Sequence, residues 1–162
     1  MTKHHLSNKS GMILKGATEK DLVQIQKLLE TNELPYKDIP SKIDSLFLGF
    51  VGSQFVGIGG LELHGNYGLL RSLVIEESVR GQGYGILLTN RLIEYAQKKG
   101  IHEIYLLTMT AEKFFTKMHF RSIERIATPL AIQKTTEFAS LCPDTAVCMV
   151  LRIRKANSKG SN

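Results

Sequence analysis

The stretch Arg80-Gly81-Gln82-Gly83-Tyr84-Gly85 lies between two apolar runs and decides how the rest of the chain is interpreted. Residues 69–75 before it read as a strand, and residues 86–96 after it have the apolar spacing of a helix. Glycines at alternate positions let the backbone pass close to a ligand, and the first N–H groups of a helix have no partner inside it. Because the helix dipole is positive at this end, such groups bind anions, most often phosphate. We therefore expect a phosphorylated cofactor here.

The residues around the glycines narrow the class of cofactor. A Walker A loop requires Lys-Ser/Thr after its last glycine, where this chain has Ile86-Leu87, and a dinucleotide fingerprint begun at Gly81 would require glycine at position 86. The pattern Arg/Gln-x-x-Gly-x-Gly/Ala fits instead, with Arg80, Gly83 and Gly85 at its fixed positions. That pattern is the pyrophosphate loop of the GNAT family of N-acetyltransferases, which this chain resembles. A glycine-rich turn that caps a helix for local reasons is the alternative.

The order of predicted elements agrees with this resemblance. Thr18 and Asp21 form a capping-box pattern before a helix at 22–30, and Gly100 suits the end of the helix that follows the loop. Strands are predicted at 12–15, 46–51, 55–63, 67–75, 104–108 and 146–153, and further helices at 39–45, 111–118 and 129–137. This order is that of the GNAT fold, an α/β (α+β) fold with a mixed central sheet flanked by helices. We expect one domain at 12–153 between flexible tails at 1–11 and 154–162.

The resemblance implies acetyl-CoA as cosubstrate. In the family the end of the fourth strand offers backbone groups to the pantetheine, and the glycine loop holds the pyrophosphate. The cofactor-binding residues expected on this basis are Leu73, Val74, Ile75, Arg80, Gly81, Gln82, Gly83, Tyr84, Gly85, Thr108 and Phe115.

A second motif, residues 111–120 (AEKFFTKMHF), is similar to the family pattern A-x-x-[LF]-Y-x-x-x-G-F. Phe115 replaces the tyrosine that often protonates the departing thiolate, so thiolate protonation is left to water. His119 replaces the usual glycine, and Thr108 replaces the usual asparagine.

Within the family the chain most resembles the small ArsN-type acetyltransferases associated with arsenic-resistance operons. The runs that carry this are GLE at 60–62, LLRSL at 69–73, LLT at 106–108, AEKFF at 111–115 and TEFASLCP at 136–143. Phe115 is normal for that branch. The resemblance implies a small amino-acid-like acceptor amine, such as phosphinothricin or arsinothricin, and a role in arsenic or antibiotic resistance.

Glu62 is the first candidate for a catalytic base, because an amine must lose a proton before it attacks a thioester. Strand alternation puts Glu62 on one face with Gly60 and His64. Glu62 could instead be an exposed carboxylate at the rim, and His64 is an alternative base or a plain turn histidine.

Arg71 is the second catalytic candidate, because it interrupts an apolar strand and a buried charge needs a partner or a ligand. Its planar guanidinium could hold the carboxylate or phosphinate of the acceptor. Alternatively it pairs with an internal acid such as Glu62 or Glu112. Ser72 alternates to the opposite face.

The distribution of charge and of apolar residues limits which classes of partner the protein could have. The net charge is +6, but six of the 21 basic residues lie in the terminal segments, so residues 12–151 hold equal numbers of acids and bases. We therefore expect no nucleic-acid partner. With no long apolar run or signal sequence, a cytoplasmic protein without a membrane partner is expected, and a homodimer is left open.

Cys142 and Cys148 match no common zinc pattern, so no metal site is expected. The simpler interpretation is that both are buried free thiols, and the alternative is that they are ligands for a metalloid. Two other functions therefore stay open beside the small-molecule enzyme: a peptide or protein acetyltransferase, and an inactive acyl-CoA-binding or As(III)-sensing module.

Overall fold

The computed structural model describes residues 11–153, and the predictions about residues 1–10 and 154–162 lie outside them. Seven strands in this part of the chain form one mixed sheet in the order β1-β2-β3-β4-β5-β7-β6. The strands are β1 (Met12–Gly16), β2 (Leu46–Val51), β3 (Gln54–His64), β4 (Tyr67–Ile75), β5 (Glu103–Thr108), β6 (Arg121–Ser122) and β7 (Val147–Arg152). The β4–β5 pair is parallel, whereas β1–β2, β2–β3, β5–β7 and β6–β7 are antiparallel. The predicted mixed sheet with flanking helices is confirmed.

The α-helices in the described residues are α2 (Leu22–Thr31), α3 (Ile39–Lys42), α4 (Tyr84–Lys98), α5 (Glu112–Lys117) and α6 (Leu130–Gln133). Thr18 and Asp21 form the predicted capping box ahead of α2. The prediction for 129–137 is wrong in extent: α6 has four residues, and a π-helical turn follows at Glu137–Leu141. The two-residue strand β6 was not predicted, because two residues are too few to show a period of alternation.

Residues group by their contacts into two compact units. Unit 1 holds residues up to Gly60 together with Ser72–Glu94, and unit 2 holds Leu61–Arg71 together with the residues from Tyr95 onward. The prediction of a single domain over 12–153 stays a prediction.

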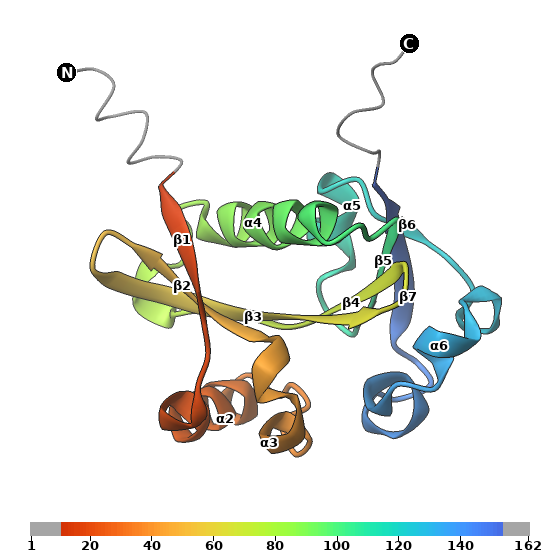
Figure 1. Cartoon of the computed structure of the whole chain (residues 1–162), viewed down its shortest axis with the longest axis horizontal. Helices are drawn as coiled ribbons and strands as arrows, with labels where there is room; N and C mark the ends of the chain where they lie inside the picture. Colours follow the sequence, from red (N-terminus) through yellow and green to blue (C-terminus); the bar gives the residue numbers. More distant parts are fainter. Residues whose placement is uncertain (1–10, 154–162) are drawn as a thin grey trace, which may run out of the picture. The chain divides into compact units, whose positions relative to one another are not determined.

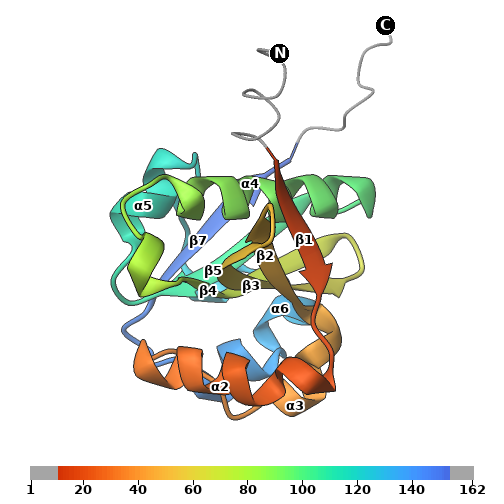
Figure 2. The ribbon, with the colours of Figure 1, turned by 90° about the vertical axis from the view of Figure 1, so that its left-hand side faces the viewer.

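Unit 1 is layered. Helices α2 and α3 lie side by side on one side of β1 and β2, and the first part of α4 lies on the other (Figure 1; Figure 2). The amphipathic spacing of α2 buries Ile25 and Leu29 completely. Both belong to a core cluster with Ile39, Leu46, Leu48, Ile58 and Val74. This core supports the end of β4 that precedes the glycine loop.

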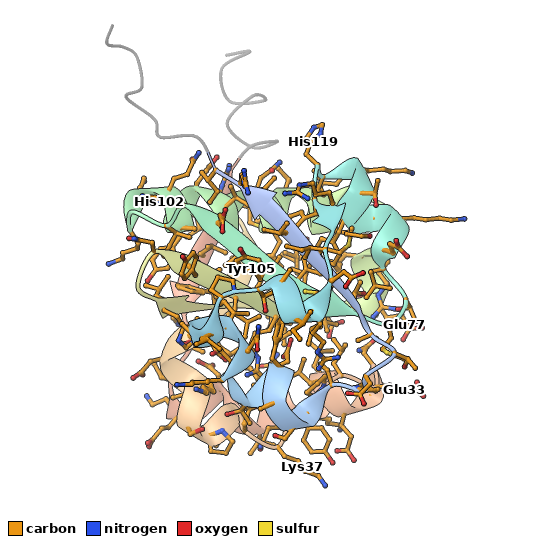
Figure 3. All side chains as sticks on the ribbon, turned by 90° about the vertical axis from the view of Figure 1, so that its right-hand side faces the viewer. Glu33, Lys37, Glu77, His102, Tyr105 and His119 are labelled. Carbon is orange, nitrogen blue, oxygen red and sulfur yellow. The ribbon has the colours of Figure 1, made fainter. Side chains whose placement is uncertain are left out.

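Unit 2 is built around the β5–β7 pair, which runs in register from Glu103↔Arg152 to Thr108↔Val147. Its core contains Leu69, Tyr105, Ile132, Phe138, Cys148 and Val150. The β4–β5 ladder has three pairs and ends at Leu69↔Tyr105. In Figure 3, Tyr105 lies among the packed side chains of this unit and His119 projects from its surface.

Two helices end in a left-handed residue that is not glycine. After α5, His119 has φ of 78°, and Phe120 and His119 donate their N–H groups to the carbonyls of Phe115 and Thr116. This pair of bonds is the Schellman motif, which usually has glycine at the left-handed position. Glu33 (φ 60°) holds the same position after α2, and Gly100 (φ 80°) holds it at the end of α4.

Replacing His119 by glycine is expected to stabilise the protein by about 1 kcal/mol, because glycine removes the steric cost of the left-handed conformation. The side chain of His119 is exposed, so little packing is lost. Urea unfolding monitored by circular dichroism should show a higher midpoint for His119→Gly and a lower one for Gly100→Ala. An unchanged or lower midpoint for His119→Gly would contradict the cap assignment.

Candidate functional site

The glycine loop of unit 1 has the backbone that close approach to a ligand requires. Gly81 and Gly83 have φ of 80° and 85°, a region that other residues rarely adopt. A Cβ built on either glycine would meet no atom within 4 Å, so the space over the loop is open. Within residues 11–153, the N–H groups of residues 82–86 donate to no backbone carbonyl. An open loop with free donors at the start of a 15-residue helix fits a pyrophosphate.

Arg80, the first fixed residue of the loop motif, positions the loop. Its Nε donates to the Ile75 carbonyl at 2.8 Å, and its Nη2 donates to Asn32 Oδ1 at 2.9 Å. Asn32 is the C-cap residue of α2. The guanidinium therefore joins the end of β4, the end of α2 and the start of the glycine loop.

The backbone of β4 alternates in direction at its carboxyl end. The Val74 carbonyl faces β3, because a Cβ added to Gly57 would lie 2.4 Å from its oxygen, and the Glu76 N–H donates to the Val56 carbonyl. Leu73 and Ile75 therefore present their backbone groups away from β3. The Ile75 carbonyl accepts a hydrogen bond from Arg80. Within the described residues, Leu73 is therefore the one of these two residues whose backbone N–H and carbonyl are both available on the side of β4 that faces away from β3.

Ser72 breaks the regular alternation that the sequence suggested for this strand. Its φ is 61°, the left-handed region, inside a strand where neighbouring residues are extended. A non-glycine residue held there costs of order 1–3 kcal/mol and is common at functional sites. The prediction that Ser72 lies opposite Arg71 rested on regular alternation, which this conformation interrupts.

Thr108 and Phe115 are the two residues of unit 2 expected to bind the cofactor, and both contact neighbouring residues of their own unit. The Thr108 hydroxyl accepts a hydrogen bond from the Ala111 N–H at 2.9 Å, which holds the turn into α5. Phe115 is buried and packs edge-to-face against Phe114 and Phe120, at centroid distances of 5.0 and 5.4 Å. The assignment of both residues to cofactor binding stays a prediction.

A buried cluster of charges joins both catalytic candidates. Arg71 Nη1 donates to Glu62 Oε2 at 2.8 Å, and Arg71 Nε lies 3.3 Å from Glu137 Oε1. The other oxygen of Glu62, Oε1, lies 2.9 Å from His64 Nε2. The side chains of Arg71, Glu62 and Glu137 are 0%, 4% and 4% exposed, whereas that of His64 is 27% exposed. Among these four side chains, His64 is the one that connects the cluster to solvent.

The cluster decides between the alternatives left open for Glu62 and Arg71. The rim position for Glu62 is wrong, because its side chain is buried between Arg71 and His64. Pairing of Arg71 with an internal acid is confirmed for Glu62 but wrong for Glu112, whose carboxylate accepts from Ser122. Sequence reasoning missed Glu137, because a π-helical turn has no period that shows which side chain points inward.

The run at 136–143 that carried the ArsN resemblance forms this π-helical turn. Arg125 secures it by donating to the carbonyls of Phe138 and Pro143, both at 2.8 Å, and its guanidinium lies 5.5 Å from the centre of the Phe138 ring. Phe138 anchors the turn in the core of unit 2. The conformation places Glu137 against Arg71.

Tyr105 is a further side chain that could donate a proton, but its contacts are those of a structural residue. It is buried and donates its hydroxyl to Glu103 Oε1 at 2.5 Å. Burial, together with that carboxylate, raises the pKa of Tyr105 above its ordinary value, so this phenol is a poor proton donor at neutral pH.

Cys148 is expected to resist labelling in the folded protein. Burial raises the pKa of the Cys148 thiol to about 11, so about one molecule in a thousand carries the thiolate at pH 8. A chromogenic thiol reagent should therefore modify Cys142 alone until the protein unfolds, and Cys142→Ser should remove the native reaction. Two equally fast native thiols would contradict this burial.

No helix within residues 11–153 combines the length and apolar character that a bilayer crossing requires. Nor do three or more His, Cys, Asp or Glu side chains in this part of the chain lie close enough together to hold a metal ion.

The model of the acetyltransferase (GNAT) family matches residues 20–120, which include the glycine loop and the whole of the second motif. The chain belongs to this family. The family is one of acetyltransferases.

Solved structures share the fold at low sequence identity. N-acetylglutamate synthase from Neisseria gonorrhoeae, complexed with coenzyme A and N-acetyl-glutamate, superposes with a TM-score of 0.74 at 18% identity, over 88% of this chain and 35% of that one. Rv2747 from Mycobacterium tuberculosis, in complex with CoA, gives 0.71 at 18% identity, over 88% and 99% of the two chains. Naa50 from Arabidopsis thaliana, in complex with the bisubstrate analogue CoA-Ac-MVNAL, gives 0.63 at 21%, over 88% and 99%. This chain thus spans about a third of the synthase.

Proposed function

We propose that this protein transfers the acetyl group of acetyl-CoA to the amine of a small amino-acid-like acceptor. The observation that carries the proposal is the open glycine loop of a chain that belongs to the GNAT family. The loop N–H groups of residues 82–86 would hold the pyrophosphate, and acetyl-CoA would supply an activated acyl group. The Leu73 N–H would polarise the acetyl carbonyl, as a single donor of the oxyanion-hole type.

The acceptor class rests on the ArsN resemblance and on a solved structure with the same fold that holds N-acetyl-glutamate. Glu62 and Arg71 would act on the acceptor side. Since Arg71 is already paired with two carboxylates, we assign it to holding Glu62 rather than to clamping an acidic group of the acceptor. A phosphinate or arsinate analogue of glutamate is the specific acceptor that the resemblance suggests, with a role in arsenic or antibiotic resistance.

A peptide acceptor is the second candidate, favoured by the fold shared with Naa50, which was solved with a peptide bisubstrate analogue. The As(III)-sensing alternative is disfavoured by Cys148, because a buried thiol with a pKa of about 11 is a poor metalloid ligand.

Thiol release from acetyl-CoA, followed with a chromogenic thiol reagent, tests the proposal. The panel holds phosphinothricin, arsinothricin, methionine sulfoximine, glutamate, other amino acids, polyamines and short peptides, with an enzyme-only blank for Cys142. Release that depends on an amino-acid-like acceptor supports the proposal. Release with peptides alone would transfer it to the second candidate, and silence across the panel would count against an acetyltransferase of this acceptor class.

A further inference from the structure

Two elements that are far apart along the chain meet at the Arg80 side chain, and both belong to unit 1. The guanidinium donates to the Ile75 carbonyl at the end of β4 and to Asn32 Oδ1 at the end of α2. Asn32 precedes Arg80 by 48 positions. A guanidinium presents its N–H groups in a rigid planar fork, so hydrogen bonds to two elements fix its orientation more closely than one would.

The Asn32 amide is oriented by its own helix. Its Nδ2 donates to the Leu28 carbonyl at 2.8 Å, and its Oδ1 accepts from Arg80. A carbonyl only accepts hydrogen bonds and a guanidinium only donates them, so the two partners require opposite ends of the amide. The Asn32 N–H also donates to carbonyls of the last turn of α2, and the residue is half-buried. Helix α2 therefore holds the amide oxygen toward Arg80.

The end of α2 also favours a positive charge. The last carbonyls of a helix have no partner inside it, and the helix dipole is negative at this end. Helix α2 has no basic residue in its own last turn. Arg80 brings a cation to Asn32, the C-cap residue, and so supplies the charge that this helix end favours.

We propose that Asn32 is a positioning residue for the glycine loop and that it acts through Arg80. Within residues 11–153 the N–H groups of residues 82–86 donate to no backbone carbonyl, so the loop is held mainly by its two ends. One end runs into α4, and the other is Arg80. A loop that is already held in its binding conformation loses less entropy when the ligand binds. The inference rests on the pyrophosphate site proposed above.

Removing the amide of Asn32 should weaken acetyl-CoA binding by a modest factor. Arg80 is exposed, so water competes for its N–H groups, and one such hydrogen bond changes an equilibrium constant about fivefold. We expect Asn32→Ala to raise Kd about fivefold, and Arg80→Ala, which loses both bonds and the charge, about twentyfold. Because Asn32 acts through Arg80, the double variant should match Arg80→Ala. Independent effects would instead multiply to about a hundredfold.

Isothermal titration calorimetry with acetyl-CoA measures these four proteins and requires no acetyl acceptor. Thr18→Ala is the matched control, because Thr18 caps the turn that leads into the other end of α2. Loss of either cap should lower the midpoint of urea unfolding. Acetyl-CoA affinity should fall for Asn32→Ala alone, with Thr18→Ala within twofold of the wild type. A role of Asn32 in helix stability alone would make the two variants alike in both measurements.

Arg80→Lys is a second variant, which changes only an exposed side chain and keeps its charge. An ammonium lacks the fork that reaches two acceptors, so Kd should again rise severalfold. Binding by Asn32→Ala or Arg80→Lys within twofold of the wild type, or a double variant with multiplied effects, would overturn this inference. The loop assignment would then stand if Gly83→Val still lost binding. Retained binding by Gly83→Val, or no binding by the wild type, would overturn both.

Discussion

Replacing Gly83 by valine is expected to abolish measurable acetyl-CoA binding while the fold survives. A Cβ at this position enters space that no protein atom occupies, so the substitution causes no clash within the protein. The φ of 85° is a conformation that a β-branched residue avoids, so the loop must change its backbone and its N–H groups must turn. Two lost charge-assisted hydrogen bonds, at about 1.5–3 kcal/mol each, weaken binding about a hundredfold or more.

The control for this variant is Gly52→Val in the turn between β2 and β3. Gly52 has φ of 62°, a Cβ added to it would likewise meet no atom within 4 Å, and it also belongs to unit 1. Both variants should lose a similar amount of stability, about 1–2 kcal/mol, from strain. Isothermal titration calorimetry should then show lost acetyl-CoA binding for Gly83→Val alone. Binding by Gly83→Val within threefold of the wild type would show that the loop is not the pyrophosphate site.

Arg71→Ala is expected to destabilise the protein by about 3–5 kcal/mol, because it leaves the carboxylates of Glu62 and Glu137 buried without their shared cation. The stability of Arg71→Lys should lie between that of the wild type and that of Arg71→Ala, since an ammonium cannot reproduce the fork that contacts both acids. Urea unfolding of the three proteins measures both effects.

Arg152→Ala provides the comparison on the surface of the same unit. Arg152 lies 3.0 Å from Glu103, but its side chain is 72% exposed. An exposed pair of this kind contributes about 0–1 kcal/mol. If Arg71→Ala were no more destabilising than Arg152→Ala, the cluster would not depend on Arg71 for its charge balance.

The sequence predicted the elements that have a strong period or a specific cap. Strand β3, helix α2 and its capping box, and the glycine loop before α4 all have such local signals. Strand alternation also correctly put Glu62 and His64 on one face, where they now form a hydrogen bond. These features follow from residues that are neighbours along the chain.

The features that could not be predicted from the sequence depend on contacts between residues far apart along the chain or on unusual backbone conformations. Glu137 meets Arg71 from 66 positions away through a π-helical turn that has no recognisable pattern. The left-handed φ of Ser72 and of His119 could not be predicted from residue types that rarely adopt it. The family pattern did contain a signal for the left-handed conformation of His119, because it has glycine at that position.

The central claim is that this chain moves an acetyl group from acetyl-CoA to an acceptor nitrogen. Its most direct test is mass spectrometry of the acceptor after incubation with the protein and acetyl-CoA labelled with ¹³C in the acetyl group. We expect the label in an amide on the acceptor amine, formed with the wild type and not with Gly83→Val. Label found only in free acetate, at equal rates with and without acceptor, would contradict the claim.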